Sequence, residues 1–131
     1  MGRKDSHMKL KLAVVTLWGE DVDQMLNFYR DVLGLPLVLM DRGRPHFDFG
    51  GGYLAILKGQ PHKVQDTKKS RFPVIAFAVD DLHEDMHRLD VHGVAMPWGL
   101  EEDSDSRWVM FYDPGGNLIE VAIIGVDKHN S

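Results

Sequence analysis

Three residues in predicted strands could together supply metal-binding or acid–base chemistry. They are His46, Asp48 and Glu120, and one imidazole with two carboxylates is a donor set that suits iron, manganese or zinc. His46 and Asp48 alternate along one strand and therefore share a face, whereas Glu120 lies on a strand near the C-terminus. Since nothing in the sequence brings those strands together, we favour separate roles and keep Glu120 and His46 as candidate acid–base catalysts.

A further histidine pair, His83 and His87, has the i, i+4 spacing that can hold zinc on a helix. The apolar stripe of that helix consists of Leu82, Met86 and Leu89, so both imidazoles are expected to face water. There is no cysteine, which excludes thiolate nucleophiles and cysteine-bound zinc. The pair therefore does not predict a metal site.

The elements that carry these residues form a unit that occurs twice. Residues 14–18 are an apolar run typical of a strand, and Asp21 with Gln24 is a variant capping box that begins a helix ending at Gly34. The same order returns in the second half of the chain: a strand at 74–79, the capping pair Asp81 and Glu84, and a helix end at Gly93. Such an internal repeat predicts two similar modules.

Three short strands are predicted after each helix, which makes each module βαβββ and the fold class α+β. Their ranges are 37–40, 45–49 and 53–58 in the first half, and 94–98, 107–112 and 118–124 in the second half. The acidic segment 101–105 is expected to be an exposed hairpin loop.

Side chains alternate across a strand, so each predicted strand has two faces. One face is bulky and almost wholly apolar and should pack under the helices: Val15, Leu17, Phe47, Phe49, Leu54, Ile56, Ile75, Phe77, Val79, Val109, Phe111, Ile119, Val121 and Ile123. The opposite face, here called the second face, mixes small, aromatic and titratable side chains, which suits a ligand site. The candidate ligand-binding residues on or near it are Thr16, Trp18, His46, Asp48, Tyr53, Trp98, Trp108, Met110, Tyr112 and Glu120. A partly wet sheet face or a dimer contact is the alternative.

Composition favours a single globular domain. The chain has 131 residues, of which 44% are hydrophobic and 27% charged, with a formal net charge of −5. That charge disfavours nucleic acid as a partner, and no apolar run approaches the roughly 20 residues of a membrane span. We expect a cytoplasmic protein that binds neither nucleic acid nor membrane.

The domain limits follow from where periodic patterns begin and end. Residues 1–8 are expected to be a cloning remnant with the native start at Met8, and the domain to span 9–126. Within it, module one covers 9–62, a basic linker 63–72 and module two 73–126, followed by a tail at 127–131.

Two motifs resemble the glyoxalase/bleomycin-resistance/dioxygenase superfamily, also called the vicinal-oxygen-chelate superfamily. They are NFYRDVLGL at 27–35 and FYDPGGNLIE at 111–120, and the resemblance extends over essentially the whole chain after Met8. It implies that the eight strands form a curved mixed sheet around a cavity, and that the protein is a homodimer. The motifs identify the fold rather than the reaction.

In metal-using members, the ligands come from the first and last strands of each module. The corresponding positions here are Val14, Ala55, Val74 and Glu120, and valine and alanine have no lone pair to donate. The resemblance is therefore closest to the metal-free bleomycin-resistance type, and we expect no metal and no cofactor. The predicted function is binding of a small molecule, such as sequestration of a drug or toxin. The alternative is a metal-dependent lyase/isomerase or dioxygenase. Glu120 would contact the ligand or have a purely structural role.

Overall fold

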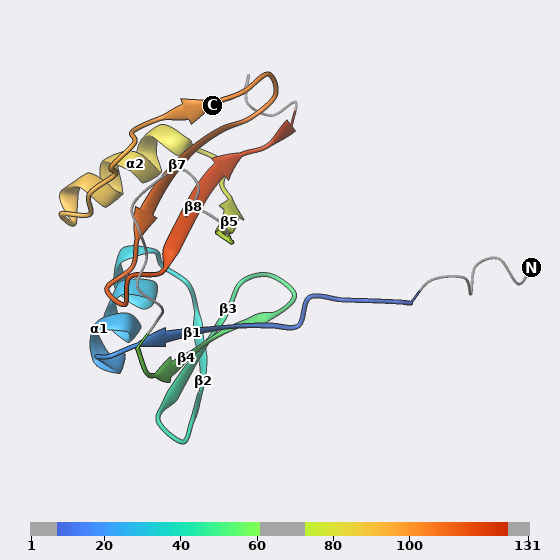
Figure 1. Cartoon of the computed structure of the whole chain (residues 1–131), viewed down its shortest axis with the longest axis vertical. Helices are drawn as coiled ribbons and strands as arrows, with labels where there is room; N and C mark the ends of the chain where they lie inside the picture. The colour runs from blue at the N-terminus through green and yellow to red at the C-terminus, as the bar shows by residue number, and fades with distance from the viewer. Residues whose placement is uncertain (1–7, 61–72, 126–131) are drawn as a thin grey trace, which may run out of the picture.

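Each half of the chain folds into a strand, a helix and three further strands (Figure 1). The computed structural model describes residues 8–60 and 73–125. Module one contains β1 (Val14–Gly19), α1 (Val22–Asn27), the π-helical turn η2 (Phe28–Val32), β2 (Leu37–Asp41), β3 (Arg44–Asp48) and β4 (Tyr53–Lys58). Module two contains β5 (Ile75–Ala78), α2 (Leu82–Val91), β6 (Glu101–Glu102), β7 (Arg107–Tyr112) and β8 (Leu118–Ile123). The predicted α+β class with two βαβββ modules is confirmed.

Some of the predicted domain limits fall outside the described residues. These are the linker at 63–72, the tail at 127–131 and residues 1–7 of the expected cloning remnant. Those limits stay predictions.

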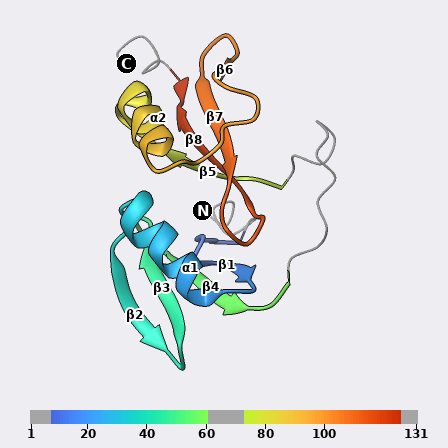
Figure 2. The same cartoon turned by 90° about the vertical axis from the view of Figure 1, so that its left-hand side faces the viewer.

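The eight strands form two mixed sheets of four. Their orders are β1-β4-β3-β2 and β5-β8-β7-β6, and in each the first and last strands of the module are parallel neighbours. Both helices lie on the same side of the molecule, and the second faces of the sheets look away from them (Figures 1 and 2). In the described part of the chain, no helix has the length and apolar character needed to cross a membrane.

The helix boundaries follow the predicted capping residues. The Asp21 carboxylate accepts a hydrogen bond from the Gln24 amide at 3.0 Å, and Asp81 accepts one from the Glu84 amide at 3.0 Å. Gly34 adopts a φ of 77°, which glycine tolerates at a helix end. The π-helical turn was not predicted: the Leu33 amide donates to the Phe28 carbonyl, five residues back, at 3.0 Å.

The predicted strand at 94–98 is wrong. The Gly99 amide donates to the Met96 carbonyl at 3.0 Å, and Gly99 has a φ of 62°, so the chain turns before it can pair. The strand forms instead at Glu101–Glu102, opposite Trp108 and Arg107. Two of the five residues of the acidic segment 101–105, which was expected to be a loop, therefore form β6, and the residues from Asp103 onward form the hairpin turn.

The apolar strand faces pack beneath the helices as predicted, in one core shared by both modules. Phe28 and Tyr29 of η2 meet edge to face with ring centres 5.3 Å apart. Phe28 also approaches Phe111 of module two at 6.1 Å, and Tyr29 approaches Phe47 at 5.8 Å. Aromatic packing therefore joins the two halves of the chain.

A buried carboxylate at the β7–β8 turn ties module two to module one. Asp113 accepts a hydrogen bond from the Tyr29 hydroxyl at 2.6 Å and bonds from the amides of Gly115 and Asn117, each at 2.9 Å. The Asn117 side chain also donates to the Trp18 carbonyl at 3.0 Å. Burial raises the pKa of Asp113, although these donors oppose the shift.

An arginine makes a second connection. Arg88 of α2 donates from Nε to the Val32 carbonyl at 2.6 Å and from Nη2 to the Asp31 carbonyl at 3.0 Å. Carbonyls at the end of a helical segment lack partners within that segment, so the guanidinium satisfies them and holds η2 against α2.

Replacing Tyr29 with Phe should lower the free energy of unfolding by about 1–3 kcal/mol, because the buried Asp113 carboxylate loses one of its charge-assisted hydrogen bonds. The Asn117 side chain still donates to the same oxygen at 3.0 Å. Urea denaturation measures the change. The matched control is Tyr53→Phe at an exposed position, where a change within about 0.5 kcal/mol is expected. Equal losses in the two variants would contradict a special role for the Tyr29–Asp113 bond.

Candidate functional site

Three residues form a row across the second face of the first sheet. Thr16 of β1 and His46 of β3 both lie opposite Ala55 of β4. His46 Nδ1 lies 3.0 Å from the Arg44 carbonyl, an acceptor, so this nitrogen carries the proton. The other ring nitrogen is the one that remains for a ligand.

The remaining candidates on this sheet are one carboxylate at a turn and two solvent-exposed aromatic side chains. Asp48 accepts a hydrogen bond from the Gly50 amide at 2.8 Å, so its carboxylate shapes the turn between β3 and β4. Tyr53, opposite Asp48, is 47% exposed. Trp18 is equally exposed, and its ring lies beside Gly59, where an added Cβ would be 3.1 Å from Cδ2.

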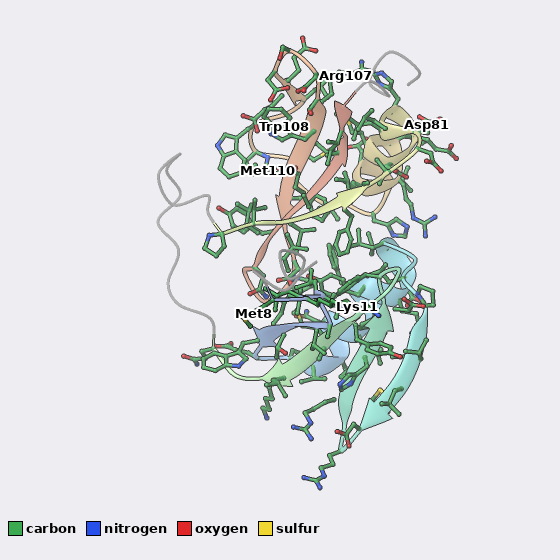
Figure 3. The ribbon with its side chains drawn as sticks, turned by 90° about the vertical axis from the view of Figure 1, so that its right-hand side faces the viewer. Met8, Lys11, Asp81, Arg107, Trp108 and Met110 are labelled. Atoms are coloured by element: carbon green, nitrogen blue, oxygen red, sulfur yellow. The ribbon has the colours of Figure 1, made fainter. Side chains whose placement is uncertain are left out.

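The second sheet holds the acidic and more heavily aromatic part of the candidate site. Glu120 of β8 lies between Ala76 and Met110 on the second face. Trp108 and Met110 point to the side of β7 away from α2 (Figure 3). Trp98, in the turn before β6, has its ring centre 6.2 Å from that of Tyr112. These side chains could hold a planar group.

Glu101 is a member of this group that sequence reasoning missed. Its Oε1 accepts a hydrogen bond from Trp108 Nε1 at 3.2 Å, since β6 places it opposite Trp108. Burial raises the pKa of the half-buried Glu120, and the charge of Glu101 raises it further. Two carboxylates that repel each other across an aromatic surface favour a cationic ligand. Sequence reasoning missed Glu101 because β6 contains only residues 101 and 102. Two residues are too few to show the alternation of side chains that predicts a strand.

The candidate residues thus fall into two groups, one on each sheet. Within residues 8–60 and 73–125, no three histidine, aspartate or glutamate side chains gather closely enough to hold a metal ion. His46, Asp48 and Glu120 are therefore not brought together. His83 and His87 are exposed, as predicted. The ligand-binding role of the ten candidates stays a prediction.

The model of the glyoxalase/bleomycin resistance protein/dioxygenase superfamily matches residues 11–121, and the chain belongs to this superfamily. It is 28% identical over 126 residues to the uncharacterized protein YraH of Bacillus subtilis (strain 168), covering 86% of this chain and 97% of YraH.

Solved structures that share the fold include two proteins connected with antibiotics. The fosfomycin resistance protein FosX of Listeria monocytogenes is 19% identical with a TM-score of 0.76, covering 92% of this chain and 98% of FosX. TnmS3, an antibiotic binding protein from Streptomyces sp. CB03234, is 20% identical with a TM-score of 0.71, covering 91% of this chain and all of TnmS3 (100%). At such identities the likeness shows the fold alone.

The residues at the family's metal positions do not fit a metal ion. Val14 precedes Thr16 by two positions on β1, Ala55 lies next to Thr16 on β4, and Val74 directly precedes β5. Their side chains carry no donor atom, which leaves Glu120 as the single ligand of the four. One carboxylate does not hold a catalytic divalent ion, so no step through a metal follows from this site.

Replacing Glu120 with Gln should stabilise the protein increasingly as the pH rises from acidic to neutral. A carboxyl whose folded pKa is raised contributes stability at low pH and loses it as the pH rises through that pKa, and glutamine removes this loss. Thermal unfolding at several pH values measures the difference. The control is Glu20→Gln at an exposed position. An equal pH-dependent gain in both variants would mean that removing any surface charge has this effect.

Proposed function

We propose that this protein binds a small planar cationic molecule on the second face of its sheets without a metal ion, and sequesters it. Candidate compounds are drugs or toxins of that character. The proposal also includes a homodimer, because a second copy would cover the exposed aromatic face.

One observation carries the proposal: Glu120 is the only donor at the four metal positions, and it lies half-buried on the same face as Trp108, Tyr112 and a second carboxylate. A buried negative charge is costly unless it is compensated. A ligand cation would supply that compensation, and the rings would cover a planar body.

The named structures support a binding role. TnmS3 is an antibiotic binding protein, and FosX is a fosfomycin resistance protein. Their functions concern antibiotics, which agrees with sequestration of a foreign small molecule. For this chain the ligand class is argued from its own carboxylates and aromatic rings.

Titration with bleomycin and with a planar cationic dye, followed by tryptophan fluorescence, tests the proposal. We expect saturable quenching that is unchanged by EDTA. Glu120→Gln should weaken binding about tenfold, since a charge-assisted contact is lost, and Glu20→Gln is the matched control. Binding should also fall as the pH drops through the raised pKa of Glu120, because the carboxylate becomes neutral. Absence of saturable quenching by both probes would count against the proposal.

The alternative function is a metal-dependent lyase/isomerase or dioxygenase, which membership of the superfamily favours. Metal analysis of protein purified without a chelator separates the two. We expect less than stoichiometric zinc, nickel, manganese and iron, and no change on Glu120→Ala. One equivalent of metal that is lost in Glu120→Ala would reverse the choice.

A further inference from the structure

A pocket of about 250 Å³ lies at the junction of the two modules, here called the junction pocket. Its walls come from the end of η2, from the residue after β3, and from β5, α2 and β8. Figure 2 shows the end of the first helix directly beneath α2, where Arg88 connects the two. None of the ten candidate residues of the sheet face lines this pocket.

The junction pocket is lined mainly by apolar side chains that the core leaves partly covered. Prominent among them are Leu33, Leu35, Phe49, Phe77 and Val79. Protein interiors are normally close-packed, and an apolar cavity of about 150 Å³ is already large enough to take up a benzene molecule. The volume therefore suits a ligand with one ring or a short branched chain.

The polar groups of the pocket set the charge of that ligand. Arg88 donates hydrogen bonds to the carbonyls of Val32 and Asp31. Asp85 lies one helical turn earlier, half-buried in the pocket wall, and Asp80, Asp81 and Glu84 add negative charge around it. Burial raises the pKa of Asp85, the three neighbouring carboxylates raise it further, and the charge of Arg88 lowers it. Because the carboxylates outnumber this one cation, the net local charge is negative.

We propose that the junction pocket is a second small-molecule site, separate from the sheet face, that binds a small apolar amine. The apolar body lies among Phe49, Phe77 and Leu89, and the ammonium group contacts the Asp85 carboxylate. Because its walls belong to both modules, a bound amine also stabilises their packing, by binding the folded state alone.

Methyl NMR of leucine- and valine-labelled protein tests this site with three probes of equal ring size: benzylamine, benzyl alcohol and phenylacetate. We expect shifts at the methyl groups of Leu33, Val79 and Val121, which line the pocket. Benzylamine should bind about tenfold more tightly than benzyl alcohol through its charge-assisted contact, and phenylacetate should bind most weakly. Absence of shifts at these methyl groups at millimolar probe would overturn the proposal.

Two substitutions then test which carboxylate recognises the ammonium group of benzylamine. Asp85→Asn should bring benzylamine to within about twofold of benzyl alcohol and leave the alcohol unchanged. An amine preference that survives this substitution would refute the role of Asp85. Glu120→Gln should leave the benzylamine-induced shifts at Leu33 and Val79 unchanged. Loss of these shifts in that variant would place the amine on the sheet face instead.

Val79→Phe should fill the pocket and weaken all three probes. The matched control is Ile75→Phe, on the same face of the same strand segment but outside the pocket lining. Equal weakening by both variants would contradict the site. If Val79→Phe does not fold, Leu35→Phe fills the same pocket from the module-one side.

Discussion

The Asp113 carboxylate must be satisfied where it is buried, and this requirement fixes how the two modules meet. A buried acid without donors would cost several kcal/mol. Its donors are two amides and a side-chain amide of its own turn, and the hydroxyl of Tyr29, 84 residues away. The turn also approaches β1 so closely that a Cβ on Gly115 would lie 2.7 Å from the Trp18 carbonyl oxygen. Together with the Arg88 hydrogen bonds and the aromatic packing, this contact holds the two modules against each other.

The two modules repeat one topology but use their second faces differently. The first sheet presents Trp18 and Tyr53 to solvent, with a histidine and a small residue between them. The second sheet places Glu101 and Glu120 beside aromatic rings. A duplicated framework therefore carries two chemically different second faces on one shared apolar core.

The acidic groups at both proposed sites are held where burial disfavours their charge. Glu120 on the sheet face and Asp85 in the junction pocket each have a raised pKa, and in each case neighbouring carboxylates add to the effect of burial. Such groups cost stability in the empty protein, which is expected of binding residues rather than of packing residues. Under the proposed function, the donor-free positions Val14, Ala55 and Val74 leave Glu120 to bind an organic cation instead of a metal ion.

The sequence by itself determined the repeated unit, the capping aspartates, the glycine helix ends and the apolar strand faces, because each depends on residues only a few positions apart. The superfamily resemblance also came from short contiguous motifs. Tertiary structure alone decided the place of β6, the π-helical turn, the contact of Glu101 with Trp108 and the Tyr29–Asp113 bond. It also created the junction pocket from five separate elements. Some of these features depend on contacts between residues that are distant in the sequence, and others depend on a local turn, such as the one at Gly99. Neither produces a repeating pattern or spacing that the sequence alone would show.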